Sequence, residues 1–436
     1  MNQKKQSNTL AFSVVTFIFF MWGFLTVMND VLIPHLKSLF HLSYAAIMLI
    51  QFMFFLAYFI MSMPSGKIVS LTGYKNSIII GLVVTGIGAL LFYPAAAIPS
   101  YGLFLTAFFI LASGITLLQV AANPYVSLLG PEKTAASRLN LSQAFNSLGT
   151  MIAGPLGSVL ILSVPILTSE QFGILSHAKQ LAYQVEQAHT VQGPYIAFAI
   201  ILFLCAVGMY LFHLPSVVTD EDLQEEQEHK EKYSFTEALK HKHLLFGVIA
   251  IFVYVGAEVS IGSFMVNFIS QPQIGHITES TAAKYLSFYW GGAMVGRFIG
   301  SALMQKLDSR KLLGIFSTIA TALVVITILT TGKVAMWAIL SVGLFNSIQF
   351  PTIFTLGIER MGKLTDKASS LLIMAIVGGA LIPLLQGVLA DNIGIHYAYV
   401  LPVLCYLYIM FYGFKGSKIV PHPETSTSAS TGTAAI

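Results

Sequence analysis

The segment PYVSLLGPE at residues 124–132 returns as PTIFTLGIE at residues 351–359, 227 positions later. Both copies keep a proline, a glycine and a glutamate at the same relative positions. Two further pairs have nearly the same offset: Gly66-Lys67 with Gly296-Arg297 at 230 residues, and Pro155 with Pro383 at 228 residues. One such match carries little weight, but three in register indicate that the second half of the chain duplicates the first.

The composition is that of a membrane protein. Of 436 residues, 56% are hydrophobic and only 10% are charged, and the mean hydropathy is +0.77. An average soluble domain has about 25% charged residues. The net charge of +4 is spread over short loops, which gives no support to nucleic-acid binding. Cys205 and Cys405 lie in apolar runs and predict neither a disulfide nor a metal site.

A membrane-spanning helix needs about 20 mostly apolar residues, and twelve stretches meet this requirement. The predicted fold class is therefore an all-α membrane protein with twelve transmembrane helices. The expected spans are 10–34, 44–64, 76–97, 100–128, 139–162, 194–214, 243–269, 283–304, 311–330, 334–358, 368–390 and 395–414. Lys4-Lys5 resembles a signal-peptide start, but no small-residue cleavage site follows, so we expect the first span to be retained.

Charged segments divide the spans into two sets of six. The expected parts are a cytoplasmic N-terminal tail at 1–9, a six-helix bundle at 10–214, a cytoplasmic linker at 215–242, a second six-helix bundle at 243–414, and a disordered cytoplasmic tail at 415–436. Loops on the side of the termini hold 18 Lys and Arg residues against four on the other side. The positive-inside rule then places both termini in the cytoplasm. The outer loop 163–193 is long enough for a short surface helix.

Two parallel six-helix repeats, related by an axis along the membrane normal, are the plan of the major facilitator superfamily. The dipeptides Gly66-Lys67 and Gly296-Arg297 resemble the superfamily's loop signature, in which glycine and basic residues lie where two helices meet at the inner face. They predict an inner-face gating motif, although Ser70 stands where the first copy usually has an acid. The alternative is that these are ordinary cytoplasmic loop charges.

Two carboxylates, Asp30 and Glu258, are the only acidic residues well inside the expected spans. A charge at that depth costs roughly 2.5–3.5 kcal/mol on insertion scales, so such residues usually mark an ion or substrate path. We predict that both handle a coupling cation. The alternative for Asp30 is a position at the outer interface, because it lies near the outer end of its span.

Amide side chains gather on the spans that line the central cavity in this plan. Gln119 and Asn123 share a helix face, and so do Gln143 and Asn146. Amides both donate and accept hydrogen bonds, which suits a polyhydroxylated ligand, and a tryptophan face suits stacking on a sugar ring. The predicted sugar-binding residues are Asn29, Gln119, Asn123, Gln143, Asn146, Trp290, Asn346 and Gln349. The alternative for each amide is a hydrogen bond between helices of the bundle.

Five stretches resemble one branch of the superfamily, the fucose–galactose–glucose symporters. They are FFMWGFLTVMNDVLIPHLK, LLQVAANPYVSLLGPEKTAASRLNLSQAFNSLGT, IFVYVGAEVSIGSFMVNF, WGGAMVGRFIGSALM and FNSIQFPTIFTLGIE, and the similarity runs from about residue 10 to 415. It is closer to bacterial glucose/galactose transporters than to fucose permeases. In the permeases, the counterpart of Asp30 pairs with a glutamate where Gln119 stands here, and an uncharged residue replaces Glu258. Neither proton coupling nor fucose specificity therefore carries over directly.

The resemblance and the membrane carboxylates together predict a secondary active transporter and not an enzyme. It would couple uptake of a hexose such as glucose or galactose to H⁺ or Na⁺ by alternating access. We expect no cofactor and no bound metal besides the coupling ion, and a monomer in the bacterial inner membrane with a small sugar and the lipid bilayer as partners. The alternatives are a symporter of L-fucose or of another sugar or polyol, and an exporter of sugars or drugs with the same fold.

Overall fold

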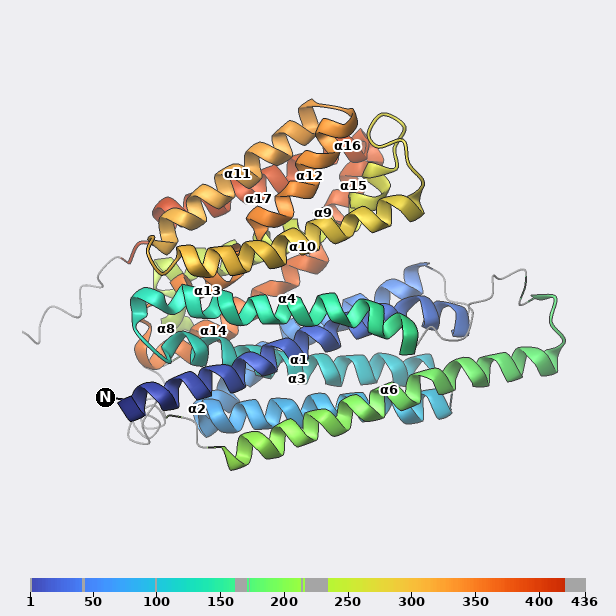
Figure 1. Ribbon diagram of the computed structural model, residues 1–436, viewed down its shortest axis with the longest axis horizontal. Helices are drawn as coiled ribbons and strands as arrows, with labels where there is room; N and C mark the ends of the chain where they lie inside the picture. The colour runs from blue at the N-terminus through green and yellow to red at the C-terminus, as the bar shows by residue number, and fades with distance from the viewer. Residues whose placement is uncertain are drawn as a thin grey trace, which may run out of the picture.

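The computed structural model describes residues 2–40, 44–98, 100–160, 171, 173–212, 215 and 234–419. Within these ranges the regular elements are helices, which form two bundles (Figure 1). The first half of the chain, drawn blue to green, forms one bundle, and the second half, drawn yellow to red, forms the other. Most of the predicted linker and residues 420–436 of the predicted tail lie outside the described residues.

The first bundle contains α1 (Asn2–Phe40), α2 (Tyr44–Ala97), α3 (Tyr101–Leu128), the turn η1 (Glu132–Thr134), α4 (Ala135–Leu160) and α6 (His177–Leu211). Two of the expected spans lie in α2, which breaks at Gly73, where φ is 75°. Glycine suits that conformation because it has no Cβ. Two helices begin earlier than expected, α1 at Asn2 and α6 at His177, so the helix expected in the outer loop is continuous with the sixth span.

The second bundle follows the short helix α8 (Phe235–Leu239). It contains α9 (Lys242–Ile269), α10 (Glu279–Leu303), α11 (Ser309–Leu329), α12 (Gly332–Asn346), α13 (Gln349–Gly357), η2 (Gly362–Leu364), α14 (Thr365–Met374), η3 (Ala375–Val377), α15 (Gly378–Ile393), α16 (Ile395–Ala398), α17 (Val400–Phe411) and η4 (Tyr412–Gly416). The expected tenth span is thus two helices, α12 and α13. The expected eleventh span is α14 and α15 joined by a tight turn.

The twelve-helix expectation is confirmed. By length and apolar composition, nine segments of the described chain can cross a membrane, and one of them, Leu49–Ala97, is long enough for two crossings. The remaining two crossings, α4 and α10, are more polar than these nine segments. They lie against each other along the boundary between the bundles (Figure 1). A helix that faces protein on this side has no need of an all-apolar surface, which explains why these two fall below the hydropathy of the others.

Small residues let helices within the first bundle touch backbone to backbone. A Cβ on Gly149 of α4 would lie 2.3 Å from the carbonyl oxygen of Phe20 in α1. One turn away, the Asn146 side chain donates a hydrogen bond of 3.0 Å to the carbonyl oxygen of Phe19. Close approach and interhelical polar bonds are how helices associate where the lipid gives no hydrophobic drive. The first and fifth crossings therefore form a rigid pair.

Candidate functional site

The two bundles meet at one end of the molecule, here named the linker end. This end holds the break at Gly73, the connection from α3 to α4 and the starts of α9, α11 and α14. A hollow of about 1070 Å³ opens there, lined by residues of both bundles. Beneath it, Ser137 of α4 and Ser301 of α10 exchange hydrogen bonds, each hydroxyl donating to the other's carbonyl oxygen at 2.7 and 2.9 Å. The bundles are therefore closed against each other at this end.

The duplicated proline motif creates a matching acceptor in each bundle. Proline has no N–H, so the carbonyl four residues earlier loses its helical partner. For Pro124 that carbonyl belongs to Val120, and the hydroxyl of Ser369 in the other bundle donates to it at 2.8 Å. For Pro351 it belongs to Ser347, and Nε of Arg297 donates to it at 3.1 Å. The repeat thus supplies two equivalent acceptors, each taken by a donor from a neighbouring helix.

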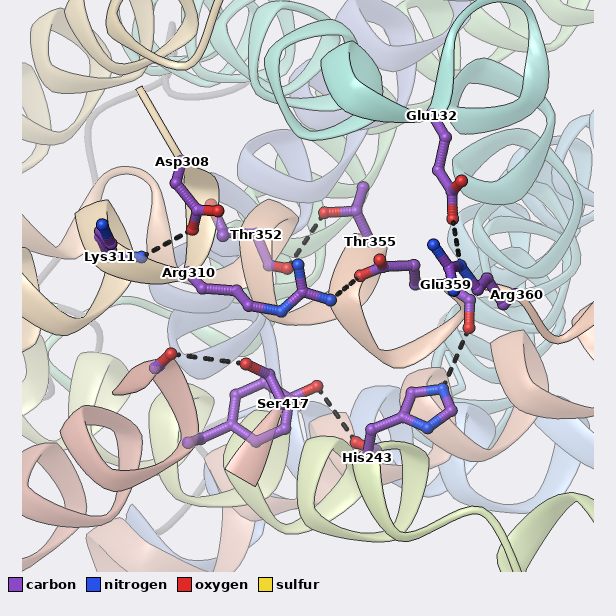
Figure 2. Close-up of polar contacts among 12 residues, drawn as sticks. Glu132, His243, Asp308, Arg310, Lys311, Thr352, Thr355, Glu359, Arg360 and Ser417 are labelled. Carbon is purple, nitrogen blue, oxygen red and sulfur yellow. Dashed lines mark hydrogen bonds and ion pairs between the residues drawn. The ribbon is translucent and has the colours of Figure 1, made fainter. Parts of the chain in front are cut away.

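Ion pairs lie above these contacts, at the surface of the linker end (Figure 2). Arg360 pairs with Glu132 of the other bundle at 3.7 Å, and both side chains are more than half exposed. Arg310 pairs with Glu359 inside the second bundle. Burial raises the pKa of the Glu359 carboxyl, and the Arg310 guanidinium acts in the opposite direction. Because an exposed ion pair contributes about 0–1 kcal/mol, the Glu132 pair adds little to closure.

Glycine allows a close approach of the bundles at this end. A Cβ on Gly66 of α2 would lie 2.0 Å from the hydroxyl oxygen of Ser370 in α14, across the boundary between bundles. Both predicted gating dipeptides lie within helices: Gly66-Lys67 in α2 before its break, and Gly296-Arg297 in α10. Lys67 is exposed. Gly296 packs so closely on α12 that a Cβ would lie 2.5 Å from the carbonyl oxygen of Leu344.

Glu258 lies deep in the second bundle, about 24 Å along α9 from Lys242 at 1.5 Å per residue. The hydroxyl of Tyr254, one turn earlier, donates to Glu258 Oε1 at 2.7 Å. The hydroxyl of Tyr289 in α10 donates to the main-chain oxygen of Glu258 at 3.3 Å. The Arg297 guanidinium is near enough to attract the carboxylate electrostatically. Glu258 as a whole residue is partly buried.

Several predicted sugar ligands are hydrogen-bonded inside the bundles. Gln119 donates to the hydroxyl of Tyr58 at 2.6 Å, and Gln349 donates to the carbonyl oxygen of Phe345 at 3.0 Å. The amide of Asn346 bonds two tyrosines, and Asn146 bonds α1 as described above. Gln119, Asn146 and Asn346 thus join different crossings, the alternative raised from the sequence, whereas Gln349 bonds within the tenth crossing.

The other predicted ligands differ in exposure. Asn123 is wholly buried, and neither atom of its amide has a hydrogen-bond partner among the residues that the structure describes. Gln143 is buried at 6% exposure. Asn29 and Asp30 lie in α1, but their side chains fall outside the described residues. Trp290 is 44% exposed, which makes it the most accessible of the predicted ligands whose side chains the structure describes.

Trp290 packs over a glycine of α9 near Glu258. A Cβ on Gly262 of α9 would lie 3.2 Å from the indole ring, and Gly262 is one helical turn beyond Glu258 on the same face. Along α10, Trp290 lies two turns before Arg297, whose guanidinium donates to the hydroxyl of Ser147 in the other bundle. Trp290 therefore shares the face of α10 that turns toward the first bundle. The half-exposed ring, the Glu258 carboxylate and the Arg297 guanidinium therefore come from two helices, α9 and α10, that pack on each other.

The model of the Major Facilitator Superfamily matches residues 11–376. The chain belongs to the major facilitator superfamily. Membership makes it a multi-pass membrane transporter rather than an enzyme, and the two bundles are the two six-helix halves of this superfamily.

Similar superfamily members have sugar-related names. The chain is 50% identical to a glucose/galactose transporter of Brucella abortus over 94% of each chain. It is 35% identical to the L-fucose-proton symporter of Escherichia coli over 94% of this chain and 93% of that one. A crystal structure of the E. coli transporter FucP, described as in the outward conformation, matches with a TM-score of 0.86 at 34% identity, covering 93% and 98% of the two chains. The resemblance to this branch of the major facilitator superfamily is confirmed, with the glucose/galactose members nearer.

Sequence reasoning missed two tyrosines of this major facilitator site. Tyr254 had a usable signal, because its spacing of four residues from Glu258 places both on one face of a helix. Tyr406 had none: the twelfth crossing reads as apolar and aromatic, yet its hydroxyl donates to Asn346 Oδ1 at 2.7 Å. An aromatic residue in an apolar run is indistinguishable from core packing until the fold brings it to a polar partner.

Proposed function

We propose that this transporter couples the uptake of a hexose, glucose or galactose, to the entry of a cation, H⁺ or Na⁺, by alternating access. Support for the sugar comes from the names of its relatives and from the hydrogen-bonding amides of the membrane-spanning helices. Support for the cation comes from Glu258, a carboxylate held deep in the membrane-spanning region. Such a position is costly for a charge and is typical of ion pathways.

One observation carries the proposal: the half-exposed ring of Trp290 lies near Glu258 within the second bundle. It packs on the ring of Tyr289, whose hydroxyl donates to the main-chain oxygen of Glu258, and over Gly262, one helical turn beyond Glu258. A sugar has hydroxyl groups around its ring edge and C–H groups on its faces. The ring of Trp290 suits those C–H groups, while the amides and Arg297 suit the hydroxyl groups. A carboxylate one helical turn away would allow sugar and cation to bind near each other.

The proposal assigns roles to the predicted residues. Glu258 and Asp30 handle the cation. Trp290, Gln143 and Asn146 contact the sugar in the arrangement described, and Asn29, Gln119, Asn123, Asn346 and Gln349 complete the polar path as the bundles move. Gly66, Lys67, Gly296 and Arg297 belong to the closing contacts between and within the bundles.

The proposal also assigns a conformation and a location. The excess of Lys and Arg on the side of the termini favours a cytoplasmic linker end. Closure at that end would then make this the outward-facing state, as in the similar FucP structure described by that term. The protein would be a monomer of the bacterial inner membrane with both termini inside.

Reconstituted vesicles test the proposal directly. Purified protein in proteoliposomes should exchange labelled D-glucose or D-galactose in counterflow, and should accumulate it only when a cation gradient is imposed. A pH gradient and a sodium gradient, applied separately, identify the coupling ion. Competition by unlabelled D-glucose, D-galactose and L-fucose ranks the sugars. Stronger competition by L-fucose than by both hexoses, or net efflux against a sugar gradient, would contradict the proposal.

Replacing the exposed indole tests the sugar contact. We expect Trp290→Ala to raise the KM for sugar about tenfold, since an aromatic stacking contact is worth roughly 0.5–1.5 kcal/mol beyond its buried area. Trp337→Ala is the matched control: Trp337 is 45% exposed and packs on Tyr285 and Phe288 on another part of the second bundle. Initial uptake rates at varied sugar concentration measure both variants. Equal KM changes in the two variants would remove Trp290 from the site.

A further inference from the structure

A closed set of hydrogen bonds surrounds Asn346, the last residue of α12. Tyr406 of α17 donates to its Oδ1 at 2.7 Å, and its Nδ2 donates to the hydroxyl of Tyr289 in α10 at 2.7 Å. Asn346 and both tyrosines are wholly buried. The amide therefore has a partner at each end and holds three helices in fixed relation. In this state the Asn346 side chain fixes α10, α12 and α17 relative to one another.

Tyr254 connects these hydrogen bonds around Asn346 to the Glu258 carboxylate. Its hydroxyl lies 2.7 Å from Glu258 Oε1 and 3.1 Å from the main-chain oxygen of Asn346. A phenol carries one hydrogen, so it makes one strong donor bond at a time. The two acceptors thus compete for it. An ionised carboxylate wins this competition, because hydrogen bonds to a charged acceptor are about twice as strong as neutral ones.

The second acceptor lies at an interruption of the tenth crossing. Helix α12 ends at Asn346 and α13 begins at Gln349, and the last carbonyls of a helix have no partner within it. The next carbonyl, that of Ser347, is also free of a helical partner because of Pro351, and Arg297 donates to it. Two side chains from outside the crossing, Tyr254 and Arg297, therefore hold its break. Both also act on Glu258.

The short helix beyond the break reaches the closing contacts. Thr352 of α13 lies 3.4 Å from the amide nitrogen of Asn140 in the first bundle. Helix α13 also ends at the ion-paired surface of the linker end, where Glu359 follows it (Figure 2). A change at the break between α12 and α13 is thus one short helix away from the contacts that keep the bundles closed.

We infer that Tyr254 is a positioning residue that transmits the occupancy of Glu258 to the break between α12 and α13. With Glu258 ionised, the phenol hydrogen points to the carboxylate. When a hydronium ion transfers a proton to Glu258 and leaves as water, or a sodium ion occupies the lone pairs of Glu258, the charge is neutralised and the phenol hydrogen turns to the Asn346 carbonyl. No bond to carbon changes, and the tyrosine keeps its own proton. Binding of the cation thereby adds a hydrogen bond from Tyr254 to the Asn346 carbonyl at the break between α12 and α13. This changes how firmly α13 is held at its start.

The groups that face Glu258 set the electrostatic environment in which Tyr254 changes its hydrogen-bond acceptor. They include Tyr254 on α9, Tyr289 and Arg297 on α10, and Tyr406 on α17. Only Tyr254 donates both to the Glu258 side chain and to the break. Removal of its hydroxyl leaves the carboxylate, the cation Arg297 and the Asn346 amide in place. The inference rests on the proposed cation coupling at Glu258, and it adds the route by which that coupling reaches the gate.

The test compares exchange with accumulation in proteoliposomes. Tyr254→Phe keeps the ring and loses only the hydroxyl. We expect sugar counterflow within twofold of the native protein, and a steady-state accumulation at least fivefold lower, because the bundles then move with sugar whether or not Glu258 holds a cation. Tyr399→Phe is the matched control: Tyr399 is wholly buried, and its hydroxyl has no hydrogen-bond partner among the described residues. It should change neither quantity.

Two further variants make each outcome decisive. Tyr406→Phe removes a bond to the Asn346 amide but leaves the hydrogen bond between Tyr254 and Glu258 in place, so it should lower the thermal midpoint while preserving the ratio of accumulation to counterflow. If Tyr254→Phe lowers counterflow and accumulation by the same factor, or leaves both unchanged, the inference is overturned. If Glu258→Gln still accumulates sugar, the proposed coupling itself is wrong. Loss of accumulation in Glu258→Gln but not in Tyr254→Phe overturns the inference alone.

Discussion

Glu258→Gln should abolish concentrative uptake while leaving sugar exchange largely intact. The amide has the shape of the carboxylate and still accepts the 2.7 Å hydrogen bond from Tyr254. What it loses is the charge that attracts a cation. One cation crossing a potential of 100 mV supplies about 2.3 kcal/mol, which permits roughly fiftyfold accumulation at about 1.4 kcal/mol per factor of ten. The variant should fall from that ceiling to an accumulation ratio of about one.

Steady-state uptake and counterflow, measured in the same proteoliposomes, separate this result from misfolding. Asp391→Asn is the matched control, because it also neutralises an acid of the second bundle, but an exposed one near the end of α15. It should accumulate sugar as the native protein does. Accumulation retained in Glu258→Gln would show that Glu258 is not the coupling residue and would leave Asp30 as the candidate.

Gly66→Leu should prevent closure of the linker end. A Cβ there would meet the Ser370 hydroxyl at 2.0 Å and its Cβ at 3.1 Å, and leucine adds three more carbon atoms. Overpacking a well-filled contact costs roughly 1–3 kcal/mol. The contact lies between the bundles, so this cost falls on the closed state and not on the folding of either bundle. We expect transport to drop at least tenfold with normal amounts of protein in the membrane.

Spin labels on Lys133→Cys and Lys306→Cys, in a background without the native cysteines, measure the closure itself. Both lysines are exposed and belong to opposite bundles at the linker end. The Gly66→Leu variant should shift their distance distribution toward longer separations. Gly208→Leu is the control, since a Cβ on Gly208 meets nothing within 4 Å. An unchanged distribution in Gly66→Leu would mean that α2 and α14 tolerate the added volume and that other contacts close this end.

The repeated proline motif illustrates what can be read from sequence and what cannot. Its offset of 227 residues was visible in the chain and indicated the duplication. The freed carbonyls of Val120 and Ser347 also follow from chemistry, because each stands four residues before a proline. Their partners do not follow. Ser369 lies 249 residues from Val120, and Arg297 lies 50 residues from Ser347. Only the packing of the helices chose those donors.

At the candidate site, too, the sequence shows that an amide needs hydrogen-bond partners, and only the packing shows which partners it has. The sequence indicated that Asn346 is polar within a membrane-spanning helix and therefore needs partners. Two roles were open to it, a sugar ligand or a bond between helices. The structure fills both ends of its amide with Tyr289 and Tyr406, which are 57 and 60 residues away. Arg297, expected in a loop motif at the inner face, instead bonds Ser347 in its own bundle and Ser147 across the boundary between the bundles.

The sequence by itself determined the membrane class, the twelve crossings, the duplication and the depth of Glu258. Each of these depends on hydropathy or spacing along the chain, and such properties are local. The tertiary structure decided which polar groups are already paired, which ring is exposed and which end is closed. Those depend on helices that are distant in sequence, because a side chain buried among helices is bonded by whichever neighbour the packing brings within about 3 Å.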